Sequence, residues 1–140
     1  MCGFRCRCVS GHAYAALWKV IVGAVHPNKE RTISILERLV RDETRLVTDA
    51  ETLQEILHRY TAIGRRDAIQ PAYDALLDIV DEVFPVEVSD MLRAKELLFS
   101  YHGISARDAV HAAVMKNRGV DTLFSFDGGY DALPFLTRLR

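Results

Sequence analysis

Hydrophobic residues recur at helical spacing in several stretches of the chain. In RTISILERLVRDE, Ile33, Leu36 and Val40 fall on one face, and this spacing predicts an amphipathic helix over residues 31–43. A second helix is predicted after residue 49, because apolar residues again form one stripe. The residues of this stripe are Leu53, Ile56, Leu57 and Tyr60.

Capping and helix-breaking residues predict where these helices begin and end. Thr48 and Glu51 form a T-x-x-E capping box for the second helix, which we expect to end near Gly64. A third helix is expected over residues 68–80, with Pro71 in the first turn, where a missing N–H is tolerated.

Two further helices are predicted in the second half of the chain. Ser89 or Asp90 caps the first of them, which runs through Leu98. The second starts at Ala106 and ends at Gly119. This last helix, ARDAVHAAV, has little polar surface, so we expect it to be buried.

Short apolar stretches between the helices predict strands. They are RLV at residues 45–47, EVF before Pro85, and TLFSF before Asp127. Strands that alternate with helices indicate an α/β fold with a mostly parallel central sheet and helices on both faces. In such sheets, functional sites form at the carboxyl ends of the strands, where Asp127 lies.

The composition is that of one globular domain, which we assign to residues 1–140, with an atypical segment over residues 1–22. The chain is 49% hydrophobic and 26% charged, and its net charge of -1 gives no overall attraction to nucleic acid. The cysteines are all in the first eight residues and are a poor disulfide framework, which favours a cytoplasmic protein. The apolar stretch over residues 13–25 is too short to span a membrane.

Acidic residues in separate elements suggest a metal site. Asp108 follows Ser105 in an S-x-x-D pattern, so it either caps its helix or serves a site. Asp127 either forms a turn with Gly128 or binds a ligand, and Glu55 is either a solvated helix residue or a site acid. Carboxylates that converge from several elements hold Mg²⁺ or Mn²⁺, which prefer oxygen ligands.

Three segments together resemble the PIN-domain family, specifically toxin ribonucleases of the VapC type. They are GAVHPNKE, VTDAETLQEILHRY and GISARDAVHAAVMKNRGVDTLFSFDGGYDAL. The resemblance covers residues 23–140. It implies a PIN-like three-layer fold and a metal-dependent endoribonuclease, in which metal-activated water hydrolyses RNA phosphodiester bonds. The implied cofactor is Mg²⁺, with Mn²⁺ as the alternative, and the implied partners are the RNA substrate, a cognate antitoxin protein and a second copy of the chain.

The resemblance also implies which residues form the site. Glu55, Asp108 and Asp127 become the catalytic and metal-binding acids, and Asp131 assists as a further metal ligand. Asp49 is expected near the site, because the strand before it ends there.

The family's first metal ligand is absent from this chain. The family opens with a strand that ends in aspartate, and here that position falls near residues 11–15, where the sequence is GHAYA. Acidic residues start only at Glu30. Either a shifted reading frame or damaged gene supplies the first segment, or the chain is a natural inactive variant, or another group such as His12 replaces the aspartate. The alternative function is a catalytically inactive PIN-like module that binds RNA or an antitoxin; a DNA nuclease ranks last.

Several other residues have two interpretations. His111 is more often a satisfied core histidine than a catalytic group, and we leave it out of the site. Arg107, Lys116 and Arg118 contact either RNA phosphates or, for the last two, the carbonyl end of their own helix. The apolar stretches EILHRY and LLDIVDEVF are candidates for the dimer surface.

Overall fold

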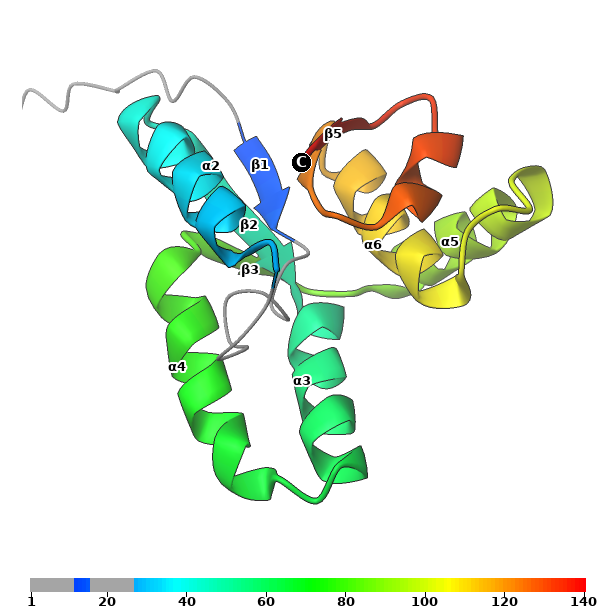
Figure 1. Ribbon diagram of the computed structural model, residues 1–140. Coiled ribbons are helices and arrows are strands. Elements are labelled where there is room, and N and C mark those ends of the chain that lie inside the picture. Colours follow the sequence, from blue (N-terminus) through cyan, green and yellow to red (C-terminus); the bar gives the residue numbers. More distant parts are fainter. Residues whose placement is uncertain (1–11, 16–26) are drawn as a thin grey trace, which may run out of the picture.

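A parallel β-sheet forms the centre of the protein. The computed structural model describes residues 12–15 and 27–140 (Figure 1). Five strands pair in the order β3-β2-β1-β4-β5, and each pairing is parallel. The strands are β1 (His12–Ala15), β2 (Arg45–Asp49), β3 (Glu82–Phe84), β4 (Thr122–Phe124) and β5 (Thr137–Leu139). The predicted α/β fold is therefore confirmed.

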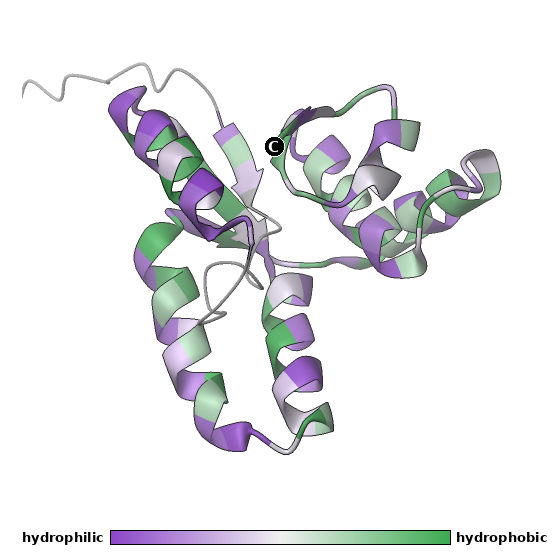
Figure 2. Ribbon diagram, viewed as in Figure 1, coloured by the Kyte–Doolittle hydropathy of each residue, from purple (hydrophilic) through white to green (hydrophobic). Residues whose placement is uncertain are grey.

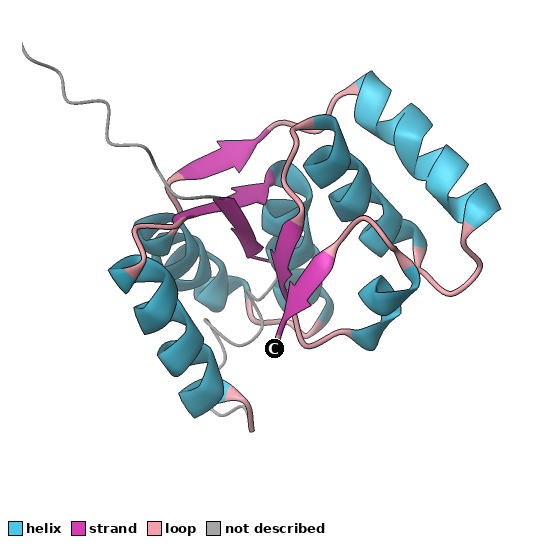
Figure 3. Ribbon diagram, turned by 90° about the horizontal axis from the view of Figure 1, so that it is seen from above, coloured by secondary structure: helices cyan, strands magenta, loops and turns pink. Residues whose placement is uncertain are grey.

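Helices cover both faces of this sheet (Figures 1 and 3). Helices α5 and α6 pack together on one side, α2 lies on the other, and α3 and α4 form a hairpin (Figure 1). The helices are α2 (Lys29–Arg41), α3 (Ala50–Ala62), α4 (Ile69–Ile79), α5 (Val88–Ser100) and α6 (Ala106–Asn117), with short 3-10 helices η1 (Arg66–Ala68) and η2 (Gly128–Ala132). None of the helices in the described part of the chain is both long and apolar enough to cross a membrane.

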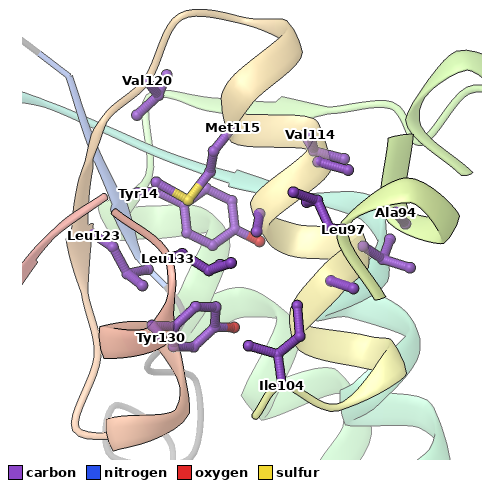
Figure 4. Close-up of a cluster of buried hydrophobic side chains, with 14 of the residues drawn as sticks. Tyr14, Ala94, Leu97, Ile104, Val114, Met115, Val120, Leu123, Tyr130 and Leu133 are labelled. Carbon is purple, nitrogen blue, oxygen red and sulfur yellow. The ribbon is translucent and has the colours of Figure 1, made fainter. Parts of the chain in front are cut away.

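The side chains of the strands alternate between two hydrophobic cores. Tyr14, Val47 and Leu123 point toward α5 and α6 and belong to the larger core (Figure 4). Their neighbours Ala13, Leu46 and Phe124 point the other way and pack against α2. A third cluster joins α3 to α4. Tyr14 is thus fixed on the face of the sheet that α6 covers.

Helix α6 is buried over most of its length, as predicted. Seven consecutive residues, from Ala109 to Met115, are buried between the sheet and α5. The other helices carry hydrophobic and hydrophilic residues side by side (Figure 2). A polar side chain on α6 therefore faces the protein interior, where it requires a partner.

The predicted buried face of the first helix is wrong. Ile33 and Val40 are exposed, and α2 instead buries Thr32, Ile35 and Leu39. Its apolar residues cover a wide arc, and contact with the sheet selects the part of that arc that is buried. Leu36 lies beside this face, in partial contact with the core.

Two predicted helix caps also differ by one to three residues. Asp49 rather than Thr48 caps α3, where its carboxylate accepts from the backbone N–H of Thr52 at 3.1 Å. Glu87 rather than Ser89 or Asp90 begins α5, and Asp90 completes that capping box from the third helical position. Thr48 and Asp49 are both competent caps, so local sequence does not decide between them.

Other predicted boundaries hold. Pro71 lies in the first turns of α4, and Gly64 and Gly119 follow α3 and α6 with φ of 71° and 69°, which suits glycine. Strand β5 falls in a stretch where we predicted none. The cysteines lie outside the described residues.

Asp90 is expected to stabilise the fold far from the carboxyl edge of the sheet. Its buried carboxylate accepts from Arg118 Nη1 at 3.0 Å, from Asn117 Nδ2 at 2.8 Å and from the backbone N–H of Glu87 at 2.9 Å. Asp90→Ala leaves these donors without their acceptor and should lower the free energy of unfolding by about 2–3 kcal/mol. Urea unfolding measures the change. Asp67→Ala, which breaks the exposed pair with Arg65, is the control and should change nothing measurable.

Candidate functional site

The carboxyl ends of β1, β2 and β4 bring several polar residues to one edge of the sheet. Tyr14 lies near the end of β1 and Asp49 at the end of β2. Asp127 follows β4, where its Oδ1 accepts from the backbone N–H of Gly129 at 2.9 Å and so caps η2. Because the strands are parallel, all three residues lie at the same edge, beside the first turns of α6.

His111 of α6 connects β1, β2 and α3 through a buried hydrogen-bond network. Its Nδ1 lies 2.9 Å from Asp49 Oδ2 and within hydrogen-bond distance of the Tyr14 hydroxyl. Its Nε2 lies 3.3 Å from Glu55 Oε1. Tyr14 and Asp49 are fully buried, and His111 and Glu55 are 2% and 8% exposed. We call these four residues the His111 network.

The network holds its histidine in the charged form. Burial alone lowers the pKa of His111, but the hydrogen bonds and charges of Asp49 and Glu55 outweigh it and raise the pKa to about 10. Burial raises the pKa of Asp49, but hydrogen bonding and charge from His111 outweigh it and lower that pKa. Burial and the charge of Asp49 raise the pKa of Tyr14 well above its usual value, so its hydroxyl stays protonated.

Glu55 has a second cationic partner at the surface. Arg107, from the first turn of α6, places its Nε 3.2 Å from Glu55 Oε1 and 3.9 Å from Glu51 Oε1. Burial and the charges of Glu55 and Asp49 raise the pKa of Glu51, while His111 and Arg107 oppose that shift. The first two turns of α3 therefore form an acidic surface that positive charges on α6 neutralise.

The charges of all three predicted site acids act on Tyr130. Its side chain is 2% exposed and extends from η2 toward the start of α6 (Figure 4). Burial raises the pKa of Tyr130 well above its usual value, and the charge of Asp108, a hydrogen bond to Asp108 and the charges of Glu55 and Asp127 raise it further. Tyr130 therefore stays protonated and hydrogen-bonded to Asp108.

Asp108 and Asp127 also approach each other across Gly129. A Cβ at Gly129 would lie 3.2 Å from Asp127 Oδ1 and 3.6 Å from Asp108 Oδ2. Asp108 does not supply the helix cap, because the Ser105 hydroxyl accepts from the backbone N–H of Asp108 at 3.1 Å. Its carboxylate is therefore left for Tyr130 and for the site.

The remaining candidate residues have other contacts. Asp131 is exposed and forms an ion pair with Arg138, with 2.6 Å between Oδ2 and Nη2. Arg118 contacts Asp90, and Lys116 lies over the ring of Phe135 at 4.5 Å. Three basic residues were predicted as candidates to contact RNA: Arg107, Lys116 and Arg118. Of these, Arg107 lies beside a predicted site acid, Glu55.

The predicted site acids are of the right chemical type to bind a divalent cation, but their side chains are not grouped as a metal site requires. Carboxylate oxygens are the ligands that Mg²⁺ and Mn²⁺ prefer. Yet among residues 12–15 and 27–140, no three Asp, Glu, His or Cys side chains are grouped closely enough to hold a metal ion. As folded here, the described residues do not fit a three-ligand metal site.

Tyr14 lies where the missing aspartate was expected. It is the last residue of β1 whose side chain points toward α6, and its hydroxyl reaches Asp49 and His111. His12, proposed as a replacement, is exposed and pairs with Arg45, the first residue of β2. His12 is thus at the amino end of the sheet, so it does not replace the aspartate.

Comparison with known proteins identifies the family. The family model of the PIN domain matches residues 19–136. The chain belongs to the PIN-domain family. It is 51% identical over 119 residues to the VapC ribonuclease Mb1869c of Mycobacterium bovis and to ribonuclease VapC13 of Mycobacterium tuberculosis, which covers 85% of this chain and 91% of each relative. Ribonuclease VapC23 of M. tuberculosis is 36% identical over 106 residues, 76% of this chain and 83% of that protein.

Solved structures share the fold. Mycobacterium tuberculosis VapC20, described as a toxin that cleaves the sarcin–ricin loop, superposes with a TM-score of 0.71 at 22% identity, over 89% of this chain and 96% of VapC20. VapBC2 of Rickettsia felis, bound to a promoter DNA fragment, superposes with a TM-score of 0.71 at 15% identity. The match covers 91% of this chain and 97% of that chain. The PIN-like fold implied by the resemblance is confirmed. VapC-type ribonucleases of the PIN family generally depend on a divalent metal ion.

The His111 network predicts how stability depends on pH. The folded pKa of His111, about 10, lies above its ordinary value of 6.5, so its contribution is complete below pH 6.5 and is lost as pH rises toward 10. Stability should fall by up to about 1.4 kcal/mol per pH unit in that window. Asp49 has a lowered pKa, so its contribution is present above pH 3.8 and is lost in acid.

Urea unfolding at several pH values measures this slope. The charged groups around His111 are Asp49, Glu51 and Glu55 from β2 and α3 and Arg107 from α6, and Tyr14 stays protonated. His111→Asn should flatten the slope between pH 6.5 and 10, whereas the exposed His102→Asn should keep it. Equal slopes in all three proteins would contradict the assignment.

Proposed function

We propose that the chain is the toxin of a toxin–antitoxin pair and an endoribonuclease that hydrolyses RNA phosphodiester bonds, impaired in this chain by the loss of the first aspartate. The supporting observation is the 51% identity to VapC ribonucleases over 91% of their length. The position of Asp108 and Asp127 beside Gly129, at the carboxyl edge of the sheet, agrees with it.

We assign roles to the site residues from the family resemblance, and their positions support the assignment. Asp108 and Asp127, whose carboxylate oxygens both lie close to Gly129, are proposed catalytic acids, and Glu55 is the third. Asp131 assists from η2, where Arg138 orients it. Arg107, partly exposed beside these acids, would contact the RNA backbone. Mg²⁺ is the ion we propose for the reaction, with Mn²⁺ as the alternative.

The proposed partners are a cognate antitoxin protein, the RNA substrate and a second copy of the chain. Solved relatives include VapBC complexes from Rickettsia felis and nontypeable Haemophilus influenzae, and their presence supports an antitoxin. For the homodimer, Ile56, Leu76 and Phe84 of the two candidate stretches are buried in the core, but Leu57 and Leu77 are exposed. We further propose that residues 1–140 act as one domain and that the protein works in the cytoplasm, where its RNA substrate would be.

A second candidate function is a catalytically inactive PIN-like module that binds an antitoxin or RNA without cutting. The observation that favours it is the buried phenol of Tyr14 at the expected aspartate position. Both candidates share the fold and partners, and they differ only in whether RNA is cleaved.

Loss of a site acid should abolish whatever cleavage the chain retains. Asp108→Asn keeps the shape of the side chain but removes its charge beside Tyr130, so the cleavage rate should fall by about tenfold or more. A fluorescent RNA and gel analysis measure the rate with MgCl₂ and with MnCl₂. Asp78→Asn, a substitution in α4, is the control and should cleave like the unmodified chain. Cleavage that persists unchanged in Asp108→Asn would contradict the proposed site.

A further inference from the structure

The acidic edge of the sheet divides into two halves with different partners. Asp108 and Asp127 lie beside Gly129 and Tyr130. Asp49 and Glu55 lie deeper and belong to the His111 network. The PIN family relies on a metal ion, whereas no described group of three side chains holds one here. The contacts of the deeper half explain this disagreement.

Asp49 is enclosed by the protein on several sides. Its side chain is fully buried and contacts His111 Nδ1 at 2.9 Å and the Thr52 backbone N–H at 3.1 Å. Tyr14 donates to it from β1. These donors use the oxygens that a cation would require, and the ring of Tyr14 fills the space beside them.

Glu55 is held from two directions. His111 Nε2 lies 3.3 Å from Glu55 Oε1 in the interior, and Arg107 Nε lies 3.2 Å from the same oxygen at the surface. Both partners are on α6, one turn apart, so they hold the carboxylate against that helix. Arg107 also places a fixed positive charge at the entrance to the site, which repels a divalent cation.

We propose that Tyr14, His111 and Arg107 withhold Asp49 and Glu55 from divalent cations, because the two positive charges on α6 already balance these two carboxylates without a metal. Asp108 and Asp127 alone then give a weak site. The inference rests on the proposed function, because that function is the reason to expect a divalent cation at this edge of the sheet. Its test measures cation binding without RNA, so the two proposals can fail separately.

Titration calorimetry with MnCl₂ on the full chain tests the inference. The unmodified chain should bind Mn²⁺ only in the millimolar range or more weakly, and MnCl₂ should not raise its melting temperature relative to EDTA. Arg107→Gln should bind Mn²⁺ at least about tenfold more tightly, because Glu55 is released and a repelling charge is removed. Arg107 is 43% exposed, so the variant should fold.

Two further variants distinguish release of the Glu55 carboxylate from the general effect of removing a positive surface charge. Arg93→Gln removes the same charge from a side chain of equal exposure, 42%, that pairs with Glu96 on α5, and should bind like the unmodified chain. Glu55→Gln combined with Arg107→Gln should lose the gain. Micromolar binding by the unmodified chain, equal binding by the Arg107 and Arg93 variants, or a gain that survives in the double variant would each overturn the inference.

Discussion

Tyr14→Asp is expected to raise the rate of RNA cleavage by at least about 100-fold, which corresponds to about 2.7 kcal/mol of transition-state stabilisation. The substitution places a carboxylate at the end of β1, next to Asp49 and on the face that α6 covers. It also removes the phenol that closes the His111 network. A fluorescent RNA substrate with MnCl₂ or MgCl₂ measures the rate.

Three variants make this result interpretable. Tyr14→Asn changes the shape in the same way without the charge and should not gain activity. Adding Asp127→Asn to Tyr14→Asp should remove the gain, since Asp127 lies at the same edge. Tyr14→Glu fills more of the space and serves if the aspartate variant is unstable. Folded acidic variants that do not cleave RNA would favour the inactive module over the nuclease.

His111→Ala is expected to lower the free energy of unfolding by about 3–5 kcal/mol, because it leaves the buried carboxylate of Asp49 without its charged partner. Urea unfolding at pH 7 measures the loss.

A double-mutant cycle assigns the loss to the pair. Asp49→Asn removes the charge at the other end of the contact, and its combination with His111→Ala should destabilise the protein less than the sum of the two single changes. Strictly additive losses would show that the two residues do not interact. His58→Ala, at an exposed position of α3, serves as the control for a histidine outside the network.

Much of the fold follows from local sequence signals. Gly64, Pro71 and Gly119 limit their helices because backbone geometry requires these residue types where they occur. The face of α2 does not follow, since its apolar residues allow two overlapping stripes and only the position of the sheet selects Ile35 and Leu39. Choices of this kind depend on tertiary contacts.

At the candidate site, too, some features follow from local sequence and others only from tertiary contacts. Glu55 lies outside the apolar stripe of its helix, so its spacing alone predicts a solvated residue. In the structure it is buried, because α6 with Arg107 packs over it. His111 lies three residues after Asp108, a spacing that puts both near one side of α6 and was the available signal for its role. Nothing local joins Tyr14 to His111, because 97 residues separate them in the chain.

The packing of Tyr14 has a consequence for how this lineage can evolve. Its ring belongs to the larger core with Met115 and Leu123, so a codon change that returned an acidic residue would first open a cavity there. A carrier of that change would lose stability at once, and would recover it only if neighbouring core residues grew to fill the space. Restoring the acid would therefore trade stability for activity, and substitutions that refill the core would be favoured only after it.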